Sequence, residues 1–171
     1  MRVSNPYNNK ITIVNDFVSK DEIDFMLKYF EKFYSADRNA EKDYDQIKIT
    51  AKYKFQELQH RAEKLSYSLF DIPSCSFTDI YNFGRLRSGG ISPHADNLKD
   101  GAEQDVLYGA VLYWNDEFDG GELNYTNLGI KYKPVPGDLV LHPGTEEYTH
   151  GVDDVTNGTR YTSTMFIKSL P

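Results

Sequence analysis

The stretch Ser-Pro-His-Ala-Asp-Asn at residues 92–97 places two metal-binding residue types close together. His94 and Asp96 are separated by one residue, and residues i and i+2 of an extended segment point to the same side. An imidazole and a carboxylate could therefore face one cavity. The simpler alternative is a polar turn in which Asp96 caps backbone groups. Because two ligands hold a divalent metal poorly, the metal hypothesis requires a third ligand.

Three other histidines are candidates for that ligand. His60 lies off the apolar stripe of a predicted helix, so we interpret it as a solvated residue. His142 ends the strand-like run Gly-Asp-Leu-Val-Leu-His, and His150 begins the run His-Gly-Val-Asp-Asp-Val. These two residues are eight apart, so both could not easily be ligands from one straight strand. The residues after His150 help to decide between them.

Arg160 heads the strand-like run Arg-Tyr-Thr-Ser-Thr-Met-Phe-Ile, which is otherwise uncharged. By alternation it shares a face with Thr162, Thr164 and Phe166. If that face is interior, the guanidinium is buried and needs an anion, which its own strand lacks. The carboxylate of a bound ligand would satisfy it with a bidentate pair. The simpler alternative is a surface arginine beside a Val-Thr-Asn-Gly turn.

Two histidines and one aspartate on one side of a metal leave three positions open, as in non-haem Fe(II) oxygenases. Over about residues 78–168 the sequence resembles the Fe(II)/2-oxoglutarate-dependent dioxygenases, specifically the prolyl 4-hydroxylase-like branch. The resemblance rests on ordered pieces: IYNFG before HAD, then YWNDEFDGGEL, PVPGDLVLHPG and HGVDDVTNGTRYTSTMF. His150 follows His94 by 56 residues, and Arg160 follows ten residues later.

The resemblance implies that His94, Asp96 and His150 bind Fe(II), and that Arg160 pairs with the C5 carboxylate of 2-oxoglutarate. It implies an enzyme that converts 2-oxoglutarate and O2 to succinate and CO2 while hydroxylating an unactivated C–H bond. The implied substrate is a prolyl residue in a peptide or protein, and ascorbate is a candidate accessory reductant.

Further pocket residues follow from the same resemblance. Tyr81 matches a tyrosine whose hydroxyl often joins the C5 carboxylate, and Tyr113 and Thr162 fall where relatives line that pocket. Considered alone, each of the three is an ordinary packing residue. His142 stands where the family usually has an apolar or aromatic residue, so we interpret it as structural or as a pocket wall. The double glycine at 120–121 is interpreted as a tight turn or a close backbone approach.

One departure bears on the substrate. Prolyl hydroxylases often carry a tyrosine three residues before the first iron histidine, and here that residue is Ile91. A free amino acid or another small molecule is therefore an alternative substrate. A second alternative is a non-catalytic metal-binding β-helix that serves as an interaction module.

Charge and composition narrow the partners. The 171 residues carry a formal net charge of −7, which disfavours general affinity for nucleic acid. Cys75 is the single cysteine, so a Cys-rich zinc site is excluded. With no signal peptide or long apolar run, we expect a soluble cytoplasmic protein without membrane contact. Five acidic residues are expected near the mouth of the site, where they would favour a neutral or basic substrate: Glu103, Asp105, Asp116, Glu117 and Asp119.

The elements that must position these residues begin with a strand over residues 10–18. Ser19 and Glu22 form a capping box that predicts a helix over 19–35. A second helix is predicted over about residues 50–70. Both have apolar stripes at helical spacing, which indicates packing against a sheet.

From residue 76 onward the pattern is of short strands rich in Val, Ile, Tyr, Phe and Thr. The predicted strands are SFTDIYNF, VLYGAVLYW, ELNYT, GIKYKP, DLVLH and RYTSTMFIK. Residues 97–105 are predicted to form a polar loop. The pattern favours a mainly β sandwich or barrel with helices on one face, and the resemblance implies a double-stranded β-helix, or jelly roll. We expect one domain over 1–171, with a supporting part (1–75) and a β-helix core (76–171). The oligomeric state is not indicated.

Overall fold

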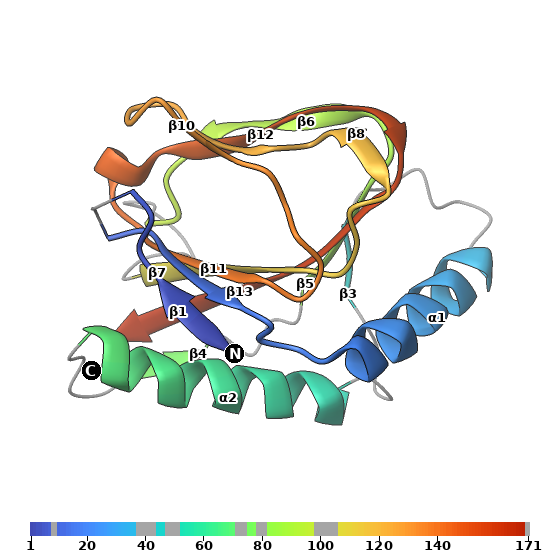
Figure 1. Cartoon of the computed structure of the whole chain (residues 1–171), viewed down its shortest axis with the longest axis horizontal. Coiled ribbons are helices and arrows are strands. Elements are labelled where there is room, and N and C mark those ends of the chain that lie inside the picture. Colours follow the sequence, from blue (N-terminus) through green and yellow to red (C-terminus); the bar gives the residue numbers. More distant parts are fainter. Residues whose placement is uncertain are drawn as a thin grey trace.

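Two antiparallel sheets face each other, and two helices pack beneath the larger one (Figure 1). The structure is a computed structural model that describes residues 1–7, 10–36, 44–46, 52–70, 75–77, 82–97 and 106–169. The larger sheet contains β1 (Arg2–Ser4), β2 (Thr12–Asn15), β3 (Tyr44–Gln46), β4 (Cys75–Phe77), β5 (Asn82–Leu86), β7 (Val106–Tyr113), β11 (Leu139–Pro143) and β13 (Arg160–Ser169). Its order is β1-β2-β11-β7-β13-β5-β3, and β4 pairs with β13.

The smaller sheet contains β6 (Gly89–His94), β8 (Phe118–Gly120), β9 (Leu123–Tyr125), β10 (Ile130–Tyr132) and β12 (His150–Gly158). Its order is β10-β9-β12-β6, and β8 also pairs with β12. From β5 to β13 the chain crosses repeatedly between the sheets, with β5, β7, β11 and β13 on one side and β6, β8 to β10 and β12 on the other. This winding is a double-stranded β-helix, so the predicted fold class is confirmed.

Alternation along the strands of the larger sheet divides the core in two. On β7, Ala110 and Leu112 face the helices, whereas Val111 and Tyr113 face the smaller sheet. The helix side is a cluster of buried residues that includes Met26, Phe30, Leu58, Ala62, Leu139, Leu141, Met165 and Ile167. The space between the sheets holds a second cluster, which includes Ile11, Ile13, Leu123, Tyr125, Tyr132, Val140 and Tyr148. One face of the larger sheet is thus sealed by the helices, and the other can contribute to a site.

Several strands of the smaller sheet were not predicted from the sequence. The run of β6, Gly-Gly-Ile-Ser-Pro-His, is almost entirely exposed and contains glycine and proline. The run of β12 has polar residues and glycine, and its pairing with β6 contains register shifts. Without alternating buried residues, neither run has the periodicity of a half-buried strand. Both strands are held by pairing with neighbouring strands. The sequence pattern also missed β8 in the smaller sheet and β1 and β3 in the larger sheet.

The helices begin and end close to the predicted positions. Helix α1 covers Lys20–Ala36 and α2 covers Lys52–Phe70. The capping box is formed, because Ser19 N–H donates to Glu22 Oε2 at 2.8 Å and Glu22 N–H donates to Ser19 Oγ at 3.3 Å. The His60 side chain on α2 is 75% exposed, as expected for a solvated helix residue. Within the described part of the chain, neither helix is long and apolar enough to span a membrane.

Glu22 also joins the two helices. Its Oε1 accepts from Arg61 Nη2 at 2.8 Å and lies 2.9 Å from Lys54 Nζ, and both bases belong to α2. The hydrogen bond from Arg61 lowers the pKa of Glu22 to about 2, although partial burial opposes the shift.

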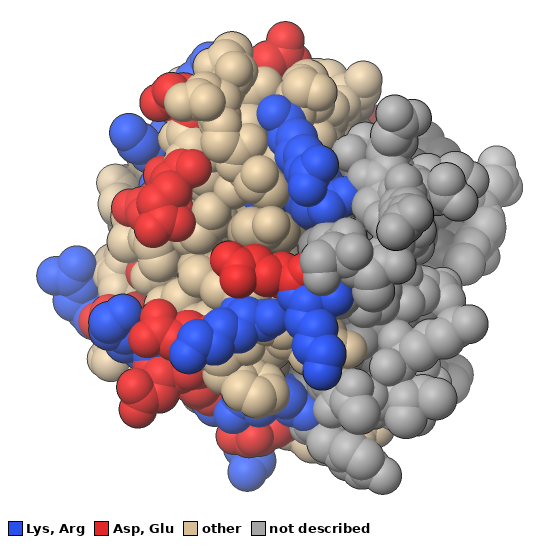
Figure 2. Space-filling model, turned by 90° about the vertical axis from the view of Figure 1, so that its right-hand side faces the viewer, with Lys and Arg blue, Asp and Glu red and all other residues tan. Residues whose placement is uncertain are grey.

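Acidic and basic side chains are interspersed on the face seen in Figure 2, so neither sign of charge dominates the described residues there.

Replacing Glu22 with Gln should lower the free energy of unfolding at neutral pH by about 1 to 2 kcal/mol, because it removes a charged partner of Arg61. Since the folded-state pKa is depressed to about 2, this stabilisation is present above the ordinary glutamate pKa and is lost as the pH falls. The difference between the parent and E22Q should therefore shrink between about pH 4.5 and pH 2.

Urea unfolding at a series of pH values measures this difference. Asp24→Asn on the same helix is the control, because Asp24 pairs with Lys20 and its side chain is more exposed than that of Glu22. We expect this variant to change stability by less than about 0.5 kcal/mol. A difference between parent and E22Q that persisted unchanged at pH 2 would contradict the assignment.

Candidate metal centre and adjoining cavity

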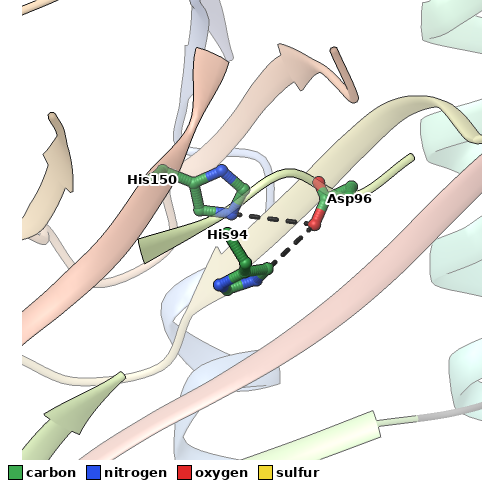
Figure 3. A group of neighbouring side chains, drawn as sticks. All are labelled: His94, Asp96 and His150. Atoms are coloured by element: carbon green, nitrogen blue, oxygen red, sulfur yellow. Dashed lines mark ion pairs between the residues drawn. The ribbon is translucent and has the colours of Figure 1, made fainter. Parts of the chain in front are cut away.

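Strand pairing brings the two distant histidines together. His94 is the last residue of β6 and His150 is the first of β12, and the two are register partners. Asp96 lies just beyond the end of β6. One ligand atom from each of these three residues lies within 4.8 Å of the other two, a spacing that could hold a metal ion. Figure 3 shows the three side chains converging from the two strands and the bend after β6.

Hydrogen bonds to the backbone orient both imidazoles. His94 Nδ1 lies 2.9 Å from the carbonyl oxygen of Ser92, and His150 Nδ1 lies 3.0 Å from that of Tyr148. A carbonyl only accepts, so each Nδ1 carries the hydrogen and each Nε2 retains its lone pair. The two Nε2 atoms lie 3.8 and 3.7 Å from the same oxygen, Asp96 Oδ1. The lone pairs that bind a metal are therefore directed at one point.

The electrostatics favour the ligand forms of these groups. Burial, with the neighbouring His142, lowers the pKa of His150 to about 4, so its ring is neutral at pH 7. Burial alone would raise the pKa of Asp96, but the hydrogen bond from His142 and the nearby imidazoles outweigh it and lower that pKa. The neutral imidazole of His150 and an ionised carboxylate are donors that suit Fe(II).

A glycine in the larger sheet makes room for Asp96. A Cβ on Gly109, in the middle of β7, would lie 2.0 Å from Asp96 Oδ2 and 2.7 Å from His142 Nε2. Asn97 N–H also donates to the carbonyl of Gly144 at 2.9 Å, which ties down the chain after Asp96. A glycine inside a strand marks a close approach, so the Gly in VLYGAVLYW was the available sequence signal for this feature.

His142 is not one of the three grouped donors, although it is nearby. It is fully buried, and its Nε2 lies 3.0 Å from Asp96 Oδ2. His142 is not among the residues that line the cavity described below. The interpretation of His142 as a structural residue therefore fits better than its interpretation as a pocket wall. Sequence reasoning missed its hydrogen bond to Asp96.

The three donors open into a cavity of about 260 Å³ between the sheets. Its wall includes all four residues predicted to share a face of β13: Arg160, Thr162, Thr164 and Phe166. Apolar residues complete much of the lining, among them Ile91, Val111, Leu123 and Val152. Pockets for small molecules occupy about 300 to 1,000 Å³, so this cavity has room for one small ligand.

Arg160 is buried in the cavity wall, with 4% of its surface exposed. Its Nε donates to the carbonyl of Gly121 at 3.1 Å, and its Cζ lies 5.2 Å from the ring centre of Tyr113. Among the described residues, no carboxylate lies within ion-pairing distance of this guanidinium. Gly120 and Gly121 have positive φ values and make close approaches, so of the two interpretations the close backbone approach is confirmed.

Tyr113 lies beside Arg160 and opposite Thr162 in the pairing of β7 with β13. Its hydroxyl is buried and, among the described side chains, is the buried polar atom that lacks a hydrogen-bond partner. Burial raises the pKa of Tyr113 to about 12 although Arg160 opposes the shift, so the phenol keeps its proton. A guanidinium without a carboxylate partner and a hydroxyl without a hydrogen-bond partner, both judged among the described residues, thus lie side by side and could bind an anion.

Other sequence-based expectations fall elsewhere. Tyr81 and residues 98–105 lie outside the described residues. Phe118 and Asp119, on β8, pair with Gly158 and Asn157, at the opposite end of β12 from His150. Seven strand residues correspond to roughly 20 Å. Asp116, Glu117 and Asp119 are not among the residues that line the cavity, and Glu103 and Asp105 are not described, so the acidic mouth stays a prediction.

Curated proteins of similar sequence include prolyl 3-hydroxylase 2 of Mus musculus, which is 41% identical over 58 residues, 31% of this chain and 8% of that protein. The PKHD-type hydroxylase PiuC of Pseudomonas aeruginosa is 42% identical over 65 residues, 36% of this chain and 28% of that protein. A PKHD-type hydroxylase of Stutzerimonas stutzeri is 33% identical over 110 residues, 58% of this chain and 46% of that protein. The chain spans less than half the length of each of these relatives.

Solved structures of similar fold include a viral collagen prolyl hydroxylase from Paramecium Bursaria Chlorella virus-1 in complex with 2OG. Its TM-score is 0.76 at 16% identity, over 96% of this chain and 98% of that chain. A Pseudomonas putida prolyl-4-hydroxylase has a TM-score of 0.76 at 17% identity, over 96% and 95% of the two chains. A Trichoplax adhaerens prolyl hydroxylase, in complex with a hypoxia inducible factor peptide fragment, has a TM-score of 0.73 at 19% identity, over 95% and 84%. At these identities the likeness shows that the jelly-roll fold is shared.

Replacing Gly109 with Ala should weaken metal binding at least about tenfold, because the added Cβ displaces the carboxylate of Asp96. Titration with Co(II), followed by its visible absorption, measures the affinity, and circular dichroism checks the fold. Gly129→Asn is the control, since a Cβ there meets no atom within 4 Å and Asn tolerates a positive φ. If folded G109A bound Co(II) as tightly as the parent, Asp96 would not be a ligand in the position described.

One protein-family model matches residues 80–168, just over half of the 171 residues. The matched segment contains the three grouped donors and Arg160, so the likeness covers the whole of the candidate site. The paired histidines and the buried Arg160 both fall within it. The chain belongs to the 2OG-Fe(II) oxygenase superfamily.

Proposed function

We propose that this chain is an Fe(II)- and 2-oxoglutarate-dependent dioxygenase that hydroxylates a prolyl residue in a peptide or protein. The observation that carries the proposal is that one cavity contains both a three-donor group and a buried arginine that has no carboxylate partner among the described residues. Together they match the two ends of a dicarboxylate that binds a metal at one end and a guanidinium at the other.

His94, Asp96 and His150 would hold the iron. Their donor atoms come from one side, which leaves adjacent positions for other ligands. Fe(II) supplies the chemistry that couples decarboxylation of 2-oxoglutarate, with O2, to hydroxylation of a C–H bond. The protein contributes two imidazoles, each fixed by its Nδ1 hydrogen bond, and an ionised carboxylate.

Arg160 would bind the C5 carboxylate of 2-oxoglutarate, and Tyr113 and Thr162 would complete its pocket. Gly121 occupies Arg160 Nε, which leaves the outer nitrogens of the guanidinium to form a bidentate pair. The Tyr113 phenol keeps its proton and lacks a partner, so it can donate to the same carboxylate. A buried donor without an acceptor is costly, and the cosubstrate would satisfy it.

The size of the cavity indicates how the substrate approaches. About 260 Å³ is little more than one small molecule occupies, so a peptide would lie outside and insert a single side chain. His94 is partly exposed, with 43% of its side chain accessible, whereas His150 is buried. The metal would therefore be reached from the His94 side. The apolar side chains of Ile91 and Val152 line the cavity and would suit a pyrrolidine ring.

The neighbours of similar fold support a prolyl substrate, because they are a collagen prolyl hydroxylase and prolyl hydroxylases, one of them bound to a peptide. Ile91 favours the alternative of a free amino acid, because it stands where prolyl hydroxylases often have a tyrosine. Both substrates use the same metal centre and the same chemistry.

Arg160→Gln should raise the KM for 2-oxoglutarate about 10- to 150-fold, the range expected for a charged hydrogen-bonded pair. Tyr113→Phe should raise it about 2- to 10-fold without loss of stability, since the hydroxyl has no partner to lose. The measurement is succinate formation at varied 2-oxoglutarate. Lys20→Gln, at an 84% exposed side chain, is the control for loss of one positive charge. An unchanged KM in R160Q would exclude Arg160 from cosubstrate binding.

A peptide library tests the substrate directly. Protein with Fe(II), ascorbate and 2-oxoglutarate should add one oxygen atom to proline-containing peptides and should leave matched peptides with Ala in place of Pro unchanged, as read by mass spectrometry. Asp96→Ala should abolish the reaction. Oxidation of free amino acids alone would favour the small-molecule alternative. Failure to form succinate with every substrate would favour a non-catalytic metal-binding module.

A further inference from the structure

A chain of hydrogen bonds leads from the core to Asp96, and the mechanism above does not use it. His142 is fully buried between Asp96 and Tyr125, which is itself fully buried. His142 Nε2 lies 3.0 Å from Asp96 Oδ2, and His142 Nδ1 lies 2.8 Å from the Tyr125 hydroxyl. Both nitrogens of one imidazole are therefore engaged.

The direction of these bonds follows from the partners. The ionised Asp96 only accepts, so His142 Nε2 carries the hydrogen. A phenol hydroxyl can donate to Nδ1, so the bond between Tyr125 and His142 fits a ring whose hydrogen lies on Nε2. Burial raises the pKa of Tyr125 well above its ordinary value, so this hydroxyl retains its proton. Tyr125 thus selects the tautomer in which His142 donates to the carboxylate.

The two oxygens of Asp96 therefore have different partners. Oδ2 is occupied by His142, whereas Oδ1 faces the Nε2 atoms of His94 and His150. Gly109 is the residue paired with His142 across β11 and β7, and it leaves the space in which Oδ2 lies. A carboxylate held in this way offers one oxygen to a metal.

We propose that His142, oriented by Tyr125, is a positioning residue that keeps Asp96 a one-oxygen ligand and thereby sets the metal affinity of the site. The inference rests on the proposed role of His94, Asp96 and His150 as metal ligands, and it adds two residues that act through Asp96. With Oδ2 held by His142, Asp96 would offer a bound metal only Oδ1.

A packing role alone has different consequences. His142 lies against His150, with ring centres 4.2 Å apart, so an aromatic residue of similar shape would preserve much of that contact. It would not donate to Asp96. The hydrogen bond and the packing can therefore be separated by comparing a residue that keeps the shape with one that keeps the donor.

The experiment compares three variants by Co(II) titration of the purified apoprotein. His142→Phe should weaken Co(II) binding about 10- to 100-fold, the usual effect of losing a partner of a metal ligand, and should change the visible spectrum of the bound Co(II). His142→Gln places an amide N–H near the position of Nε2 and should retain affinity within about threefold of the parent. Tyr125→Phe keeps the ring but frees His142 to change tautomer, and it should weaken binding by an intermediate factor.

The results distinguish the proposals. Weak binding in both H142F and H142Q, or parent affinity in both, would overturn the positioning role, because the donor would not be the cause. Should H142F fail to fold, H142Q and Y125F still decide, since parent affinity in Y125F together with tenfold loss in H142Q would contradict the chain of bonds. His94→Ala serves as the reference, since it should lose Co(II). Parent affinity in H94A would overturn the metal centre itself, and with it this inference.

Discussion

The pairing of β6 with β12 is the constraint on which the candidate site depends. Two residues 56 positions apart, His94 and His150, become register partners at one end of the smaller sheet. Each ring is then fixed by a carbonyl two residues before it in the chain, so the donor geometry is a local property of two strand ends. The larger sheet provides the floor, and the helices support it from the other side.

The buried charged groups of this fold differ in the partners that surround them. Asp138 is 2% exposed, and its Oδ2 accepts from Asn15 Nδ2 at 2.7 Å and from Tyr132 Oη at 2.8 Å, so two donors within the fold stabilise this carboxylate. In Asp96, Oδ2 is hydrogen-bonded to His142, whereas Oδ1 lies near the Nε2 atoms of His94 and His150. Among the described residues, no carboxylate pairs with the guanidinium of Arg160. Burying a charged group without a full set of partners costs free energy. Asp96 and Arg160 both line the same cavity.

Sequence patterns predicted the parts of the molecule that obey simple periodicity. The strands of the larger sheet that line the core have alternating β-branched and aromatic residues, and α1 has its capping box, so both were found. The polar strands β6 and β12 were not, because pairing rather than burial of side chains holds them. The candidate ligands were nevertheless identified, because their order and spacing resemble those of a family.

The limits of prediction lie in contacts between residues that are distant in sequence. Nothing local marks His142 as the partner of Asp96, since their proximity depends on how β11 crosses beneath the end of β6. The space at Gly109 has the same origin. The nine residues of β12 are a further example, because the length of this strand is not apparent from its polar sequence.

Residues 109–111 of β7 line the cavity, and the geometry of this strand has a consequence for length selection. Gly109 lies under the carboxylate of Asp96, and Tyr113 lies beside Arg160, on the same face four residues further on. Four strand residues span about 13 Å of backbone, which is longer than a five-carbon dicarboxylate. A molecule of that size can join the metal end to the cationic end only because the side chains of Asp96 and Arg160 extend into this interval. The length of the ligand that fits is therefore set by the reach of these two side chains, and a shorter cation at position 160 would select a longer ligand.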